Sequence, residues 1–130
     1  MPLVHVDVPE AVTEETRHLI GDVVYDALRS ELSAPRTTAS SSSPATAAPA
    51  CRSPLTTWGI ERSEKALIIQ VTLNAGRSVD LKRAFYAAVA DGLHERVGVR
   101  REDVFINLVE VPPENWSFGN GIAQYAPTNA

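Results

Sequence analysis

Length, composition and charge limit what this chain can be. Its 130 residues suit one compact domain, and its net charge of −4 with scattered Lys and Arg lacks the basic face that nucleic-acid binding requires. No apolar run reaches the length of a membrane span, and no signal segment opens the chain. The lone cysteine, Cys51, excludes an internal disulfide and makes a thiolate metal cage implausible. We therefore predict a cytoplasmic protein with no metal, no nucleic-acid partner and no membrane partner.

The first half of the chain predicts a strand followed by a helix. Pro2–Val8 is rich in valine and is typical of a strand that begins without a disordered leader. Thr13 is a candidate N-cap, with two glutamates in the first turn where the helix dipole favours them. The apolar residues that follow recur at helical spacing and predict an amphipathic helix to about Leu32: Leu19, Ile20, Val23, Val24, Ala27 and Leu28.

The second half repeats this pattern and extends it. Leu67–Leu73 predicts an apolar strand, and Ala75-Gly76 supplies a turn. Ser78 is a candidate N-cap of a helix that ends by Gly98. Val104–Val111 predicts a further strand, which should lie parallel to the strand before the helix.

The two halves superpose as an internal repeat. Placing Thr13 on Ser78 brings Arg17 onto Lys82 and Leu28 onto Leu93, and it aligns Val4, Val6 and Val8 with Ile69, Val71 and Leu73. We predict an α+β fold of two pseudo-twofold-related β-α-β units, with both helices on one face of a small, roughly four-stranded sheet. Strands that are apolar on both faces need cover on both. Subunits packing around a threefold axis would supply it, so we predict a homotrimer.

The single domain, residues 1–130, divides into four segments. The first β-α half spans 1–32 and the second, β-α-β half spans 58–111. Between them, residues 33–57 form a Ser/Ala/Pro-rich linker that takes the place of the first half's closing strand. The C-terminal tail, residues 112–130, includes an aromatic, Gly-rich segment that we expect to pack against the core or a neighbouring subunit.

Pro2 and Arg77 are the residues with predicted chemistry. Removal of Met1 would leave Pro2 with a rigid secondary amine, fixed at the first residue of a core strand, that can act as acid, base or nucleophile. Arg77 lies at a strand-to-helix turn, where a helix N-terminus and a guanidinium together favour a carboxylate. The alternative for Arg77 is a solvated side chain.

These features resemble the tautomerase superfamily, in its malonate semialdehyde decarboxylase branch. The resemblance rests on Pro2 and its strand, on Arg77-Ser78, on Phe85-Tyr86, on Glu102-Asp103-Val104 leading into Leu108-Val109-Glu110, and on Asn115-Trp116-Ser117-Phe118-Gly119. The resemblance implies a trimer with Pro2 at the floor of a pocket near subunit contacts, and an activity that needs no cofactor. Trp116 and Phe118 are implied substrate-binding residues, with core or interface packing as the alternative.

The chain also departs from the branch. The first of the branch's two arginines falls on Ala75, and its acidic residue falls near Thr38, so hydratase chemistry is not expected. His5, His18 and His94 have no metal-ligand spacing. Nothing in the sequence requires Glu110 or Tyr125 at the site.

Three functions follow as hypotheses. The first is a cofactor-independent decarboxylase of a small β-keto acid, malonate semialdehyde, which yields acetaldehyde and CO₂ through Pro2 and Arg77. The second is a keto–enol tautomerase of a 2-keto acid such as phenylpyruvate, which needs Pro2 neutral as a base. The third is a catalytically silent trimeric binding protein. A Pro2 pKa near neutrality favours the tautomerase, and one well above neutrality favours the decarboxylase.

Overall fold

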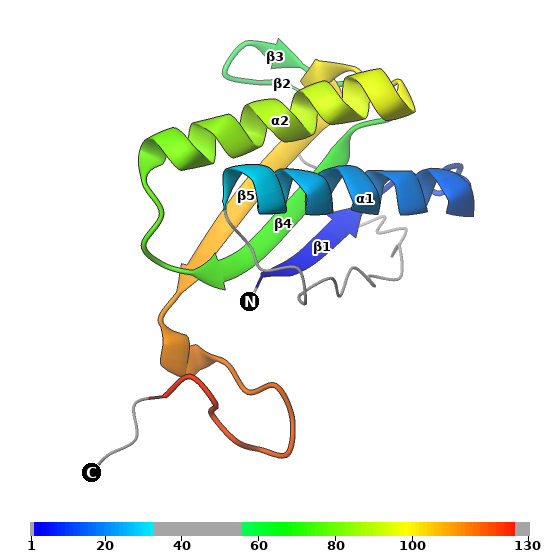
Figure 1. Cartoon of the computed structure of the whole chain (residues 1–130). Coiled ribbons are helices and arrows are strands. Elements are labelled where there is room, and N and C mark those ends of the chain that lie inside the picture. The colour runs from blue at the N-terminus through cyan, green and yellow to red at the C-terminus, as the bar shows by residue number, and fades with distance from the viewer. Residues whose placement is uncertain (1, 33–55, 127–130) are drawn as a thin grey trace.

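The computed structural model describes residues 2–32 and 56–126, which form a sheet with two helices and a small hairpin (Figure 1). In chain order the elements are β1 (Leu3–Asp7), α1 (Glu14–Glu31), β2 (Thr56–Thr57), β3 (Ile60–Glu61), β4 (Leu67–Asn74), α2 (Val79–Val97) and β5 (Val104–Val111). Two short 3-10 turns, Arg101–Asp103 and Pro113–Asn115, flank β5.

Both helices begin where their caps predict. The Thr13 hydroxyl accepts a hydrogen bond from the N–H of Thr16 at the start of α1, at 3.2 Å. The Ser78 hydroxyl does the same for the N–H of Leu81 at the start of α2, also at 3.2 Å. Each cap satisfies a backbone donor that the helix itself leaves unpaired. The predicted start of each helix is therefore confirmed.

The main sheet has the order β1-β4-β5, with β1 antiparallel and β5 parallel to β4. Val4 lies opposite Val71, and Val6 lies opposite Ile69. The alignment of the two halves exchanges Val4 with Ile69 and Val71 with Val6, so it converts the first of these pairs into the second. It also exchanges the paired residues His5 and Gln70 with each other. The local twofold axis of the repeat therefore passes between His5 and Gln70, as the predicted pseudo-twofold symmetry requires.

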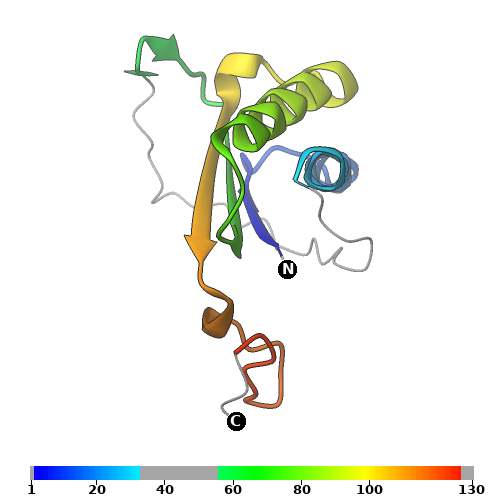
Figure 2. The same cartoon turned by 60° about the vertical axis from the view of Figure 1, so that its left-hand side comes forward.

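Both helices cover the same face of the sheet, as predicted (Figure 2). The core lies between these layers and consists mainly of Ile20, Val23, Val24, Ala27, Leu28, Leu67, Ile69, Val71, Leu73, Phe85, Val89 and Leu93. The helices pack closely at Gly92, where an added Cβ would lie 2.7 Å from a methyl carbon of Val23. A side chain at Gly92 would force the helices apart, since a packed core has no room for it.

The other face of the main sheet is left uncovered by helices and is less apolar than expected. Gln70 and Asn107, paired across β4 and β5, are exposed and polar, and the exposed Leu3 lies near one end of β1. The sheet has three strands in the described ranges. The fourth strand expected for the first half falls on residues outside those ranges, as does most of the predicted linker.

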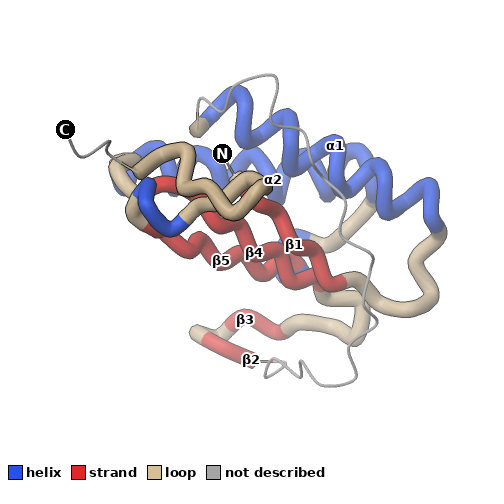
Figure 3. Tube along the Cα trace, turned by 90° about the horizontal axis from the view of Figure 1, so that it is seen from below, coloured by secondary structure: helices blue, strands red, loops and turns tan. Residues whose placement is uncertain are grey.

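The hairpin of β2 and β3 begins inside the segment predicted as a linker, at Thr56–Thr57. It lies on the side of the sheet away from the helices (Figure 3). Its tip carries Trp58, which is 96% exposed and has a positive φ of 55°. Alternation of apolar residues could not reveal so short a hairpin, because two residues per strand show no period.

Candidate active site

Three segments meet at one end of the main sheet. Leu3 of β1 pairs with Thr72, so the residue before it, Pro2, lies beside the carboxyl end of β4. Asn74, the last residue of β4, pairs with Val111, the last residue of β5. The chain start, the β4–α2 turn and the end of β5 therefore gather at one edge, near the N label in Figure 1.

Pro2 is buried at this edge, directly before β1. A buried ring at the first position of a paired strand has a defined place, unlike an ordinary frayed terminus. The structure thus places Pro2 where a fixed amine would be needed. Its catalytic role stays a prediction.

Arg77 is held by two backbone carbonyl groups. Its Nη1 donates to the carbonyl oxygen of Asn74 at 2.8 Å, and its Nε donates to that of Leu32 at 3.3 Å. Leu32 is the C-cap of α1, where the negative end of the helix dipole favours a cation. A guanidinium has five N–H donors. These two bonds orient the group and leave both Nη2 donors for a ligand, within the described part of the chain.

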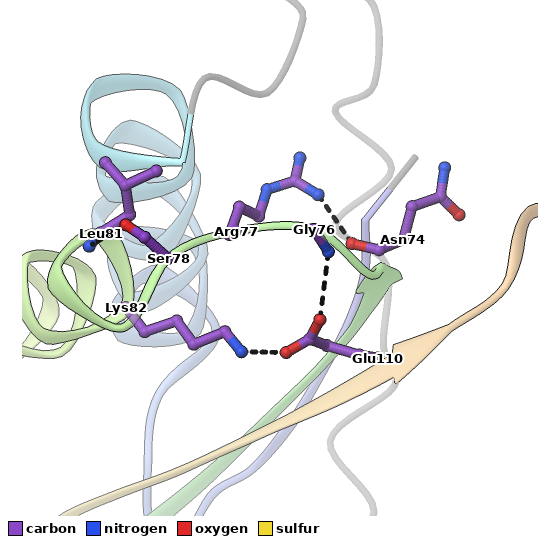
Figure 4. Close-up of polar contacts among 7 residues, drawn as sticks. All are labelled: Asn74, Gly76, Arg77, Ser78, Leu81, Lys82 and Glu110. Carbon is purple, nitrogen blue, oxygen red and sulfur yellow. Dashed lines mark hydrogen bonds and ion pairs between the residues drawn. The ribbon is translucent and has the colours of Figure 1, made fainter.

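Glu110 reaches from β5 to the β4–α2 turn (Figure 4). Its Oε2 accepts a hydrogen bond from the N–H of Gly76 at 3.3 Å, and its Oε1 forms an ion pair with Nζ of Lys82 in the first turns of α2. Gly76 has φ of +126°, a conformation that favours glycine. Glu110 therefore contacts the residue immediately before Arg77.

The tail forms an aromatic cluster against the same edge. Trp116 donates from Nε1 to the side-chain oxygen of Asn74 at 2.7 Å. Its ring stacks on Phe118 at a centroid distance of 5.7 Å, and Phe118 meets Tyr125 edge-on at 4.9 Å. Phe118 and Tyr125 remain partly exposed. The structure thus brings Trp116 to the β4 end and joins Phe118 and Tyr125 to it.

Ala75, at the position of the branch's first arginine, lies at this edge directly after β4 and is exposed. Thr38 and Cys51 fall outside residues 2–32 and 56–126. His5 contacts Asp7 at 2.9 Å, and His94 contacts the carbonyl of Val99 at 3.1 Å.

Neither a metal cluster nor a membrane-spanning helix is found in the described part of the chain. No three His, Cys, Asp or Glu side chains gather there to hold a metal ion. No helix in those ranges is long and apolar enough to cross a bilayer.

The sequence did not predict that Asn74 and Lys82 lie near the candidate site, and it did not decide whether Glu110 does. One signal was available, because Glu110 is the one charged residue in the mainly apolar strand Val104–Val111. Lys82 likewise aligned with Arg17 in the repeat, but the repeat does not say what either cation contacts. Asn74 had no signal of its own.

Comparison with known proteins identifies the family. The model of a family described as "Tautomerase enzyme" matches residues 48–119, which is more than half of the chain. The chain belongs to the tautomerase family. Residues 77, 110, 116 and 118 all fall within the matched region, whereas Pro2 lies before it.

Among curated proteins, this tautomerase-family chain is similar to two from Bacillus subtilis (strain 168). It is 45% identical over 65 residues to the probable tautomerase YusQ, covering 50% of this chain and 51% of that protein. It is 31% identical over 67 residues to the probable tautomerase YrdN, covering 52% and 51%. The chain thus spans about half the length of the curated relatives it matches.

Solved structures match over nearly the whole chain. A structure described as FG41 malonate semialdehyde decarboxylase inhibited by 3-bromopropiolate is 32% identical with a TM-score of 0.72, covering 95% of this chain and 93% of that one. A fused 4-OT wild type symmetric trimer matches with a TM-score of 0.65, covering 94% and 96%, and its 19% identity supports the fold alone. The predicted α+β fold is therefore confirmed.

Proposed function

We propose that this protein decarboxylates a small β-keto acid, specifically malonate semialdehyde, to acetaldehyde and CO₂ without a cofactor. The observation that carries the proposal is the placement of Pro2, buried at the start of β1, at the same sheet end as Arg77. The similarity to a malonate semialdehyde decarboxylase at 32% identity supports the choice of substrate.

The two residues have complementary roles in this reaction. Loss of CO₂ leaves negative charge on the carbonyl oxygen, and a protonated Pro2 amine stabilises it by a hydrogen bond. Arg77 binds the carboxylate through Nη2 and holds the breaking C–C bond out of the carbonyl plane, so that its electrons enter the π system. Because Nε and Nη1 are already bonded to backbone carbonyls, the guanidinium has little freedom to turn.

A second route uses the same amine covalently. The secondary amine of Pro2 adds to the aldehyde and loses water, and the resulting iminium takes up the electrons of the breaking C–C bond. Borohydride would reduce that iminium and leave a mass increase on the N-terminal peptide. A trapped adduct supports the covalent route, and its absence during turnover supports the hydrogen-bonded one.

Tautomerisation of a 2-keto acid such as phenylpyruvate is the second candidate. Two observations favour it: the curated relatives are named probable tautomerases, and an aromatic cluster of Trp116, Phe118 and Tyr125 lies at the β4 end. It requires a neutral Pro2 that moves a proton between oxygen and carbon. We expect it to be a weak accompanying activity, since Ala75 leaves Arg77 as the one arginine of the branch's pair and no acidic residue matches that of the branch.

We propose that the protein works as a homotrimer. No helix of the described ranges covers the sheet face opposite α1 and α2, and the partly exposed tail aromatics lie at the end of the sheet, where a neighbour would cover them. A fold neighbour is described as a symmetric trimer. Light scattering at micromolar concentration tests this, and a stable monomer would contradict it. The cytoplasmic location stays a prediction from the sequence.

The decisive experiment is a substrate test on tag-free protein whose N-terminus has been verified by mass spectrometry to begin at Pro2. Malonate semialdehyde and phenylpyruvate are compared, and the pH–rate profile reports the ionisation of the essential amine. Acetaldehyde release that needs a protonated amine supports decarboxylation. Turnover of phenylpyruvate alone would contradict the decarboxylase proposal and support the tautomerase. If neither substrate is turned over, the remaining hypothesis is a catalytically silent binding protein.

A further inference from the structure

We propose that Glu110 is a positioning residue for Arg77 and that it acts through the backbone N–H of Gly76. This inference rests on the proposed function, since it concerns the same carboxylate-binding arginine. Glu110 has no direct role in the proposed chemistry. It contacts Gly76 directly before Arg77, and it does so from a different strand (Figure 4).

The turn that carries Arg77 has few other ties to the sheet. The N–H of Ala75 donates to the carbonyl of Val111 at 3.2 Å, which fixes the first residue after β4. The next residue, Gly76, is outside the strand ladder, and its N–H donates to the Glu110 carboxylate. Beyond that point Arg77 leads into the Ser78 cap of α2. Glu110 thus holds the turn at Gly76, between the end of β4 and the start of α2.

The hydrogen bond between Glu110 and Gly76 matters because the residue that it restrains is a glycine. Gly76 has φ of +126°, and an added Cβ at that position would meet no atom within 4 Å. Neither a side chain nor close packing therefore restrains Gly76, and glycine has the widest conformational freedom of any residue. A charge-assisted hydrogen bond to its N–H is a direct restraint on the path of the backbone into Arg77.

An ordinary surface ion pair with Lys82 is the alternative role for Glu110. Exposed pairs contribute little, because water screens them and both side chains lose freedom. The Lys82–Glu110 side chains are 23% and 29% exposed, whereas those of Arg96–Asp26 are 43% and 59% exposed. Of the ion pairs that Lys and Arg make within the described ranges, Lys82–Glu110 is the most buried. Its lysine neutralises a carboxylate that would otherwise repel an anionic ligand near the turn.

Two double variants separate these roles. K82M/E110A and K82M/E110Q both remove the ion pair, and both leave the net charge of the protein unchanged. They differ in the oxygen that can accept from the Gly76 N–H, which Gln keeps and Ala loses. D26A, which breaks the more exposed Arg96–Asp26 pair, serves as a distant control, and R77A gives the effect of losing the guanidinium itself.

The measurement is binding of malonate by calorimetry, which does not require turnover. We expect K82M/E110Q and D26A to bind within about 3-fold of wild type and K82M/E110A to bind about 10-fold more weakly, the size expected for one lost charge-assisted hydrogen bond. In the enzymatic assay K82M/E110A should raise KM and also lower kcat relative to K82M/E110Q, because Arg77 both binds the carboxylate and orients the breaking bond. Circular dichroism and thermal melts establish that each variant is folded. A merely structural role would lower Tm in both double variants without separating their KM values.

Two outcomes overturn the inference, and they differ. Equal malonate binding by the two double variants, with R77A strongly weakened, removes the role of Glu110 and leaves the proposed arginine site intact. Malonate binding that R77A does not weaken, or no malonate binding by wild type, overturns the arginine site and the inference together. If K82M/E110A fails to fold, K82M/E110L takes its place, because leucine fills much of the space of glutamine but has no oxygen to accept from the Gly76 N–H. K82M/E110L should then bind malonate about 10-fold more weakly than K82M/E110Q, and equal binding by the two overturns the inference.

Discussion

The two carboxylates at the ends of β5 have opposite environments. Asp103, just before the strand, is 2% exposed, and both of its oxygens accept hydrogen bonds from Ser63, from the N–H and the hydroxyl, each at 2.7 Å. Glu110, near the other end, has a side chain that is 29% exposed and contacts Gly76 and Lys82. The Asp103 end is closed and fully paired, whereas the Glu110 end gathers Pro2, Arg77 and the tail.

This difference indicates that one end of β5 serves mainly stability and that the other end serves the candidate site. A buried carboxylate whose partners are all protein groups ties segments together and has no face left for a ligand. A half-exposed one beside a glycine turn and an arginine can influence what binds there. Changes at the Glu110 end should therefore alter activity more than stability, and changes at the Asp103 end should do the reverse.

Pro2→Ala should have the largest effect. It replaces a rigid secondary amine with a mobile primary one. We expect kcat/KM for malonate semialdehyde to fall about 10²- to 10³-fold, because a donor that no longer points at the reacting oxygen stabilises the transition state poorly. The melting temperature should fall modestly, since the substitution removes ring carbons that are buried at the start of β1. Activity is measured on tag-free protein with a verified N-terminus. A variant with near-normal kcat/KM would remove Pro2 from the mechanism.

Arg77→Ala should have the second-largest effect. We expect kcat/KM to fall by about 10²-fold, because a charge-assisted contact with the carboxylate is lost. Arg77→Lys keeps the charge without the planar fork and should recover part of that loss. Substitution of His5, His18 or His94 by Ala provides the comparison, with smaller expected effects. Assays are run well below the melting temperature, because Arg77 also bonds to Leu32. A histidine variant more damaged than Arg77→Ala would show that the anion-binding assignment is wrong.

Asp103→Ala should destabilise the protein without changing the activity of the folded fraction. It leaves two donors of Ser63 without their acceptor, and we expect the free energy of unfolding to drop by about 2–3 kcal/mol. Urea denaturation measures that loss, and kcat/KM corrected for folded protein measures activity. Glu110→Ala is the matched variant at the other end of β5. If Asp103→Ala instead raised KM with stability unchanged, the two ends would not differ as proposed.

Trp116→Phe should have a smaller effect. The substitution keeps an aromatic ring to stack on Phe118, and it removes the Nε1 donor to Asn74 together with one ring of the indole. A neutral hydrogen bond contributes about 1 kcal/mol, so we expect KM to rise about 5-fold. Steady-state kinetics with both candidate substrates checks this. A rise of 100-fold or more, judged against the Arg77→Ala effect of about 10²-fold, would place Trp116 among the primary binding groups.

Partial replacement within residues 40–50 should have the smallest effect. This segment lies outside the described ranges, and no carboxylate side chain occurs from Ser33 to Thr57. We expect decarboxylation to stay close to that of wild type, since the segment offers no carboxylate for acid–base chemistry. Replacing it with a Gly/Ser stretch of equal length and measuring acetaldehyde release tests this. A collapse of activity would show that the segment belongs to the site.

Local patterns were enough to predict the elements and their symmetry. Helical spacing of apolar residues and the hydroxyl caps Thr13 and Ser78 placed α1 and α2, because both signals act within a few residues. The repeat predicted two halves related by a pseudo-twofold axis, and the structure adds that β1 and β4 pair antiparallel with this axis between His5 and Gln70. Pro2 and Arg77 were singled out by their own chemistry and by family resemblance.

Only the tertiary structure decided what surrounds those residues. The carbonyl of Leu32 meets Arg77 across 45 residues, Asn74 meets Trp116 across 42, and Glu110 reaches Gly76 across 34. Such contacts follow from strand order and from which chain ends share a sheet edge, and neither leaves a period in the sequence. The sequence alone determined two capped helices, three strands and two chemically distinctive residues. The packing of β1, β4 and β5 decided that Pro2 and Arg77 share one end of the sheet with Glu110, because side chains from distant segments meet only when the strands that carry them are paired.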